Sequence, residues 1–110
     1  DALRDEVKLA ASIISMDDIL RTVTAEFHVK LSELQSKKRS KSLTHPRQVA
    51  MFLARTLTHH SLSEIGGYFG GRDHTTVMHA CDRIRDLSST NPSVGASVDR
   101  LVSQLRHQRS

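Results

Sequence analysis

Aromatic residues and cysteine are scarce in this chain, and each scarcity narrows the classes of protein to which it can belong. Its 110 residues include three Phe, one Tyr and no Trp, so the stacking platforms that hold single-stranded nucleic acids are nearly absent. The lone cysteine, Cys81, cannot form an internal disulfide and suits the reducing cytoplasm. Apolar runs are short and interrupted by charge, so we expect neither a membrane span nor a secretory leader.

Acidic residues are absent from a long stretch in the middle of the chain, between Glu33 and Glu64. The cations of this window are Lys37, Lys38, Arg39, Lys41, Arg47 and Arg55. The window therefore carries six positive charges in a chain whose net charge is +4. Such focused positive charge predicts a surface that binds a polyanion, although a solvated basic loop without a ligand has the same composition.

The hydrophobic pattern is helical throughout and predicts one all-α domain with an aliphatic core. Apolar residues recur at three- and four-residue steps, and no window alternates apolar with polar residues as a strand does. Capping signals mark helix starts at Ser15, at Ser61 with Glu64 three residues on, and at Asn91 before Pro92. The predicted helices cover residues 1–15, 16–27, 32–34, 46–57, 61–69, 73–87 and 92–105, with a basic loop over residues 36–45.

One segment, "FGGRDHTTVMHACDRI" at residues 69–84, concentrates His, Asp, Cys and Thr and raises the question of a metal or catalytic site. His74 and His79 are five residues apart, whereas a zinc-binding helix places its histidines four apart on one face. His79 and Cys81 are two apart and point away from each other on a helix, so they form no nucleophile–base pair. We expect Cys81 in the core, no metal, no cofactor and no enzyme activity in this chain.

Together with the residues before it, this segment has the outline of a helix-turn-helix. A short capped helix over residues 61–69 is followed by glycines at residues 70–71, and Asp73 caps a longer helix. Gly66 and Gly67 are costly inside a helix, which suggests that another helix or a nucleic-acid backbone approaches there. His74 and Thr75 would be exposed at the start of the second helix, where such side chains contact base edges in the major groove. An αα-corner without a ligand has the same outline.

Three separated motifs now show a family resemblance. They are "SKKRSKSLTHPRQVAM" at residues 36–51, "SLSEIGGYFG" at 61–70 and "GGRDHTTVMHA" at 70–80. Together they closely resemble the C-terminal DNA-binding domain of the bacterial chromosomal replication initiator family, DnaA, from about Met16 to Leu87. The resemblance implies a Trp-repressor-like fold that binds double-stranded DNA at origin boxes such as TTATCCACA. Residues 1–15 resemble the linker helix from the family's ATPase domain, and residues 16–110 its helix-turn-helix domain.

The resemblance also implies which residues contact the two grooves of the duplex. Arg39 matches the basic-loop arginine that enters the minor groove. The positions that match the segment reading the major groove are Asp73, His74, Thr75 and Thr76. Ser63 stands where the family often has Pro, and Glu64 keeps the capping box there, so we expect the helix start to survive.

Contacts to the DNA backbone are implied at five further positions. Arg47 and Gln48 match residues that contact backbone and base at the start of a helix. Lys37, Arg55 and Arg72 match positions near phosphates.

The chain begins with Asp rather than Met, so we expect a piece of a longer protein. ATP binding and contacts with other initiator protomers would belong to the missing domains, and the protein would be cytoplasmic and nucleoid-associated. Two alternatives share some of these features: a helix-turn-helix transcriptional regulator with another target, and a module that touches acidic phospholipids through its first helix and basic loop.

Overall fold

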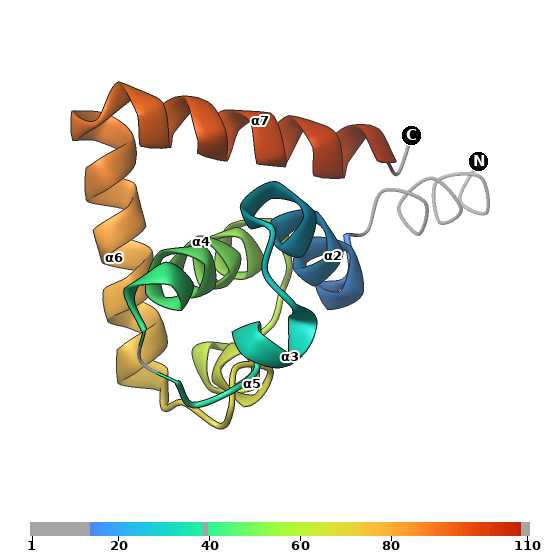
Figure 1. The fold of residues 1–110 in the computed structure, drawn as a ribbon, viewed down its shortest axis with the longest axis vertical. Coiled ribbons are helices and arrows are strands. Elements are labelled where there is room, and N and C mark those ends of the chain that lie inside the picture. Colours follow the sequence, from blue (N-terminus) through green and yellow to red (C-terminus); the bar gives the residue numbers. More distant parts are fainter. Residues whose placement is uncertain (1–13, 39, 109–110) are drawn as a thin grey trace, which may run out of the picture.

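The computed structural model describes residues 14–38 and 40–108, and within them the chain forms helices joined by short connections (Figure 1). These helices are α2 (Met16–Phe27), α3 (Leu31–Leu34), α4 (Lys41–Leu57), α5 (Leu62–Gly67), α6 (His74–Thr90) and α7 (Pro92–Gln108). The described residues contain no strand, so the predicted all-α class is confirmed. A helix was expected over residues 1–15, but residues 1–13 lie outside the described residues, so this expectation stays a prediction.

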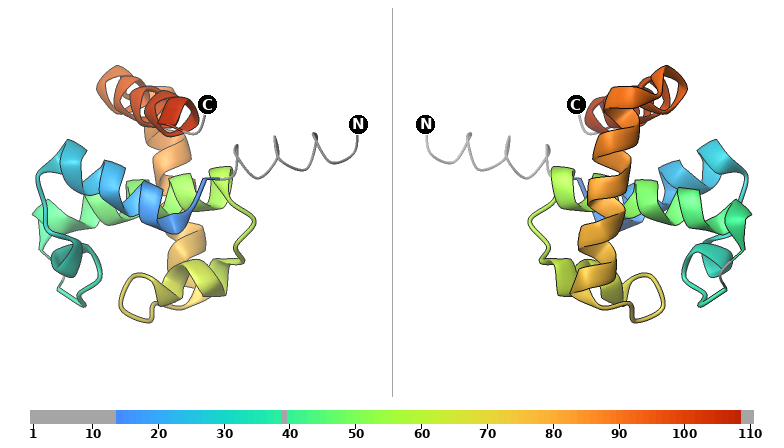
Figure 2. Two further views of the ribbon diagram at one scale, coloured as in Figure 1. Left: turned by 90° about the vertical axis from the view of Figure 1, so that its right-hand side faces the viewer. Right: turned by 90° about the vertical axis from the view of Figure 1, so that its left-hand side faces the viewer.

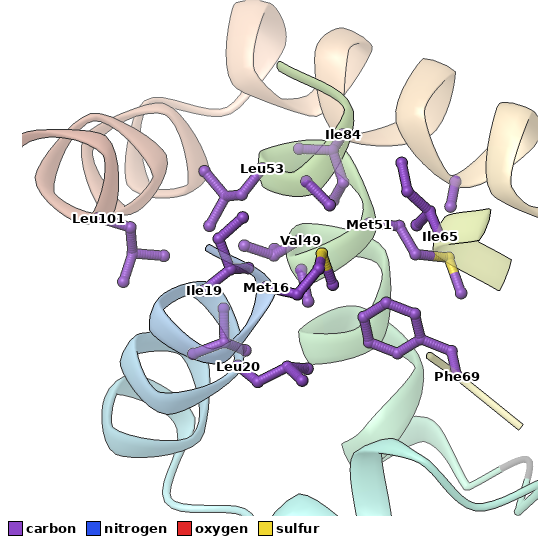
Figure 3. Close-up of a cluster of buried hydrophobic side chains, with 14 of the residues drawn as sticks. Met16, Ile19, Leu20, Val49, Met51, Leu53, Ile65, Phe69, Ile84 and Leu101 are labelled. Atoms are coloured by element: carbon purple, nitrogen blue, oxygen red, sulfur yellow. The ribbon is translucent and has the colours of Figure 1, made fainter. Parts of the chain in front are cut away.

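Helix α4 is the centre of the domain. It packs against α2, α5 and α6, while α7 crosses the far end of α6 and covers α2 (Figures 1 and 2). Figure 3 shows the resulting core, in which aliphatic and methionine side chains from these helices surround α4. The largest buried aromatic is Phe69, which is fully enclosed just beyond α5. Burial of this continuous apolar cluster is the main force that fixes the angles between the helices.

The predicted helix caps are present. The Ser15 and Ser61 hydroxyls accept from the backbone N–H of the residue three positions on, and that residue's carboxylate accepts from the backbone N–H of the serine. Asn91 Oδ1 accepts from the N–H of Ser93, 3.0 Å away, and so starts α7 next to Pro92. These bonds occupy donors that a helix leaves free at its first turn, which explains why sequence located these helix starts correctly.

The start of α4 differs from the prediction. The helix begins at Lys41 with Ser40 as its cap, five residues before the predicted start at Pro46, which lies inside the helix. The Ser40 carbonyl accepts the N–H groups of Leu43 and Thr44, both at 3.1 Å, and so closes the first turn. Burial of Leu43 favours this earlier start. Pro46 has no N–H to donate to the carbonyl four residues before it, but that carbonyl belongs to Ser42, which is exposed.

The connection between α5 and α6 depends on its glycines, as Gly66 and Gly70 show. A Cβ built on Gly66 would lie 1.9 Å from the backbone oxygen of Arg72, so the turn before α6 packs directly on the α5 backbone. The Arg72 N–H donates to the Gly66 carbonyl at 3.0 Å and fixes this approach. Gly70 has φ +79° and supplies the left-handed conformation expected of the turn. The predicted close approach is thus explained at Gly66, while nothing in the structure explains Gly67.

Candidate nucleic-acid interface

The basic loop between α3 and α4 is held in place by one buried side chain of α4. Arg47 is only 4% exposed. Its Nε donates to the Leu34 carbonyl at 3.0 Å, its Nη2 donates to the Glu33 carbonyl at 2.7 Å, and its Nη1 donates to the Lys38 carbonyl. The Ser36 hydroxyl accepts a further bond from Nη2 at 2.9 Å. A single guanidinium therefore gives the described part of the loop a defined shape, with Lys38 left exposed.

Arg47 stays charged in this environment. Burial, followed by the nearby Arg72 guanidinium, lowers the pKa of Arg47 from its usual value, but an arginine remains protonated in proteins. The resemblance implied that Arg47 contacts DNA backbone and base. In the free domain its N–H groups are directed at the loop, and little of its surface is left for such a contact.

Arg72 joins the basic loop to the turn before α6. Its Nη2 donates to the Ser36 carbonyl at 3.3 Å, and its Nε is buried without a hydrogen-bond partner among the described residues. Gly70 lies against the same loop, because a Cβ at that position would be 3.0 Å from the Gln35 carbonyl oxygen. The loop and the turn lie together at the end of the molecule opposite α7 (Figures 1 and 2).

A groove of about 430 Å³ separates the described part of the basic loop from α6. The groove is lined by Lys38, Thr44, Arg47, Gln48, Met51, Arg72, Thr76, His79 and Ala80. Its polar lining comes from two parts of the sequence: the loop with the adjoining first half of α4, and the turn before α6 with one side of α6. Sequence reasoning missed Thr44 and His79, although each lies one helical turn from a predicted site residue, Gln48 and Thr76 respectively.

The first turn of α6 presents exposed polar side chains. Asp73 Oδ1 accepts from the Thr76 N–H at 2.8 Å, and this hydrogen bond is the main cause that lowers the pKa of the Asp73 carboxyl. The carboxylate therefore remains ionised at neutral pH and caps the helix, as predicted. His74, Thr75 and Thr76 are exposed. The opposite side of α6 is in the core, as the helical spacing predicted for Val77.

The remaining predicted residues are not all brought together. Lys37 is exposed on the basic loop beside Gly70. Arg55 lies in the last turn of α4, away from the groove lining, and its Nη1 donates to the His60 carbonyl at 3.4 Å. Arg39 lies outside the described residues.

Cys81 belongs to the core and not to a reactive site. It is 4% exposed, its thiol lies 3.7 Å from the Met51 carbonyl oxygen, and burial raises the pKa of the thiol. A neutral buried thiol is a poor nucleophile and a poor metal ligand. Within residues 14–38 and 40–108, no group of three or more His, Cys, Asp and Glu side chains could hold a metal ion.

Helices α5 and α6 and the glycine turn between them therefore form a helix-turn-helix. The basic loop held by Arg47 lies beside it and adds a cationic surface. Residues 16–84 match the model of a protein family described as the bacterial DnaA protein helix-turn-helix. The chain belongs to this family. The matched segment runs from the start of α2 into α6 and contains every described residue of the groove. A DnaA helix-turn-helix binds DNA in the initiation of replication, so this domain is a DNA-binding domain.

None of the helices in the described part of the chain is both long enough and apolar enough to cross a lipid bilayer.

Proposed function

We propose that this domain binds double-stranded DNA at initiator boxes of a bacterial replication origin, TTATCCACA or a variant of it. The basic loop would enter the minor groove through Arg39, and the first turn of α6 would enter the adjacent major groove. The observation that carries this proposal is that Arg47 anchors the loop on α4 and Arg72 bonds it to the turn before α6, so that both parts lie at one end of the molecule with the groove between them.

The groove suits the DNA strand that separates the minor groove from the major groove. A protein that occupies both grooves must accommodate that strand and its phosphates between the two inserted parts. Lys38 and Arg72 supply positive charge on the groove walls, and Gln48, Thr44 and Thr76 supply neutral hydrogen-bond donors. The unpartnered Nε of Arg72 supports a phosphate contact, because a buried donor without an acceptor is costly unless a ligand supplies one.

Base readout would fall to the exposed side chains of the first turn of α6. The Thr75 methyl group can pack on the 5-methyl group of thymine, and the His74 imidazole can donate to or accept from base edges. Asp73 is committed to capping the helix through the Thr76 N–H, and its charge repels phosphates, so its contribution to readout would be confined to a cytosine amino group. Arg47 acts as a positioning residue that holds the loop.

We further propose that residues 1–15 link this domain to a preceding ATPase domain, so that ATP binding and assembly with other initiator protomers belong to that part of the protein.

The sharpest test of the proposed function is selection of binding sites by this domain from a random duplex pool. We expect enrichment of a box related to TTATCCACA. The Thr75→Ala variant, carried through the same selection, should lose preference at one position and bind the wild-type box about tenfold more weakly, with little change on random DNA. Enrichment of an unrelated operator would instead assign the domain to a transcriptional regulator, and no enrichment would contradict sequence-specific binding altogether.

The strength of binding is also expected to depend steeply on salt. If the loop, α4 and the α6 turn neutralise roughly five phosphates, log affinity should fall with log salt concentration with a slope of about −4 to −5. Fluorescence anisotropy with a labelled box between about 50 and 200 mM salt measures this slope. A slope near zero would contradict a phosphate-binding role for the cationic surface.

A further inference from the structure

Met78 is a large apolar side chain on the exposed face of α6. It is 42% exposed, while the residues that anchor α6 in the core, including Val77, Cys81 and Ile84, are almost completely buried. In a helix Met78 lies about 100° around the axis from Val77, so its side chain is directed away from the core. Packing within the domain therefore does not account for a hydrophobic residue at this position.

The surroundings of Met78 on the helix are those of the proposed base-reading segment. It follows His74 by four residues and Thr75 by three, so these three side chains form one continuous strip on the helix surface. All three are exposed. A single exposed apolar residue is common on protein surfaces, and what distinguishes Met78 is its place in this strip.

Another exposed large hydrophobic residue, Tyr68, has a ring neighbour within the domain. Its ring centroid lies 5.8 Å from that of His60. Tyr68 is thus a partly packed residue at the C-terminal end of α5. It provides a comparison for Met78, whose position on α6 points to a partner outside the protein.

The chemistry of the DNA major groove identifies such a partner. Among the groups that base edges present there, the 5-methyl group of thymine is the apolar one. A methionine side chain is unbranched and polarizable, so it can adjust to a methyl group at the floor of the groove. We propose that Met78 contacts the 5-methyl group of a thymine and extends base readout by one helical turn beyond Thr75. This inference rests on the proposed function.

The geometry also predicts where that thymine lies. Met78 is about 4.5 Å further along the helix axis than Thr75, at 1.5 Å per residue. Successive bases along a strand are about 3.4 Å apart, so the methyl group contacted by Met78 belongs to a base about one step from the one that Thr75 contacts. Two apolar contacts on neighbouring steps would favour a run of thymine and adenine at that end of the box.

The test is a scan in which each thymine of the selected duplex is replaced in turn by deoxyuridine, which removes only the methyl group. Wild-type protein should lose about fourfold in affinity at the Met78 position, the value expected for one buried methyl group. Met78→Ala should bind the unmodified box about fourfold more weakly and show no further loss at that position. Met78→Leu keeps an apolar side chain, so its affinity should still fall when deoxyuridine replaces the thymine at that position, by most of the wild-type factor.

The controls separate this inference from the proposed function. Circular dichroism should show the same helix content for all three proteins, because an exposed residue replaced by Ala or Leu keeps a good helix former. If Met78→Ala shows the same loss as wild type at every thymine, the Met78 contact is refuted while box binding stands. If wild-type protein discriminates no box from random DNA, the proposed function has failed first.

Discussion

Replacing Gly66 by Ala is expected to destabilise the domain by about 2–3 kcal/mol and to abolish specific DNA binding. The added Cβ would lie 1.9 Å from the Arg72 carbonyl oxygen and 2.9 Å from its carbonyl carbon. Backbone atoms cannot rotate away as a flexible side chain can, so the turn before α6 must shift. The shift would break the hydrogen bond from the Arg72 N–H to the Gly66 carbonyl and change the angle between α5 and α6. Helix propensity returns at most about 1 kcal/mol of this cost.

Gly67→Ala is the matched control for this prediction. It makes the same chemical change one residue away, where no atom other than those of its chain neighbours and of its own helix backbone lies within 4 Å of the added Cβ. We expect Gly67→Ala to leave stability unchanged or to raise it by up to about 1 kcal/mol, because alanine is the better helix former. Urea unfolding followed by circular dichroism measures both variants. Equal midpoints for the two would mean that α5 and the turn do not pack closely in solution.

Replacing Arg47 by Met is expected to cost about 2–4 kcal/mol of unfolding free energy and at least tenfold in affinity for the box. Methionine has a similar length but no donors, so the Leu34 and Lys38 carbonyls would lose the bonds from the guanidinium, and the Glu33 carbonyl would keep its bonds from Ser36. The loop would then lose its anchor on α4 and keep, among the described residues, only the bond from Arg72 to Ser36, so a Lys38 phosphate contact would require ordering the loop on binding. Arg47→Lys should recover little, because one ammonium cannot reproduce the fork of a guanidinium.

The same experiment separates a positioning role from direct contact with DNA. Arg55→Met is the control for stability, since Arg55 is exposed and its loss should change unfolding by no more than about 0.5 kcal/mol. If Arg47→Met unfolds at the wild-type urea concentration and still loses affinity, Arg47 contacts the DNA itself, as the family resemblance implied. Loss of stability and affinity together would support the role that the buried hydrogen bonds indicate.

Sequence located most elements correctly wherever a local signal existed. The capping boxes at Ser15 and Ser61 and the cap at Asp73 satisfy donors within three residues of themselves, so they act without help from the rest of the fold. The start of α4 was missed because its signal is tertiary. Burial of Leu43 favours five additional helical residues, and the side chain of the cap residue Ser40 makes no capping hydrogen bond.

The candidate site was predicted in its components but not in its assembly. Charge singled out the basic loop, and helical spacing singled out the exposed start of α6. Neither pattern shows that the Arg47 side chain is buried. An arginine in a basic segment looks the same in the sequence whether its side chain is exposed or buried. His79 was dismissed as a metal ligand, and its place on the groove wall depends on how α6 crosses α4.

The sequence by itself determined the helical class, the cap positions, the glycine turn and the excess of positive charge, since each of these depends on residues adjacent in the chain. Only the tertiary structure decided that Arg47 anchors the loop on α4, that Arg72 links the loop to the turn before α6, and that a groove lies between the loop and α6. These features join the α3–α4 loop, α4 and α6, which are brought together by burial of a shared core and not by any local preference.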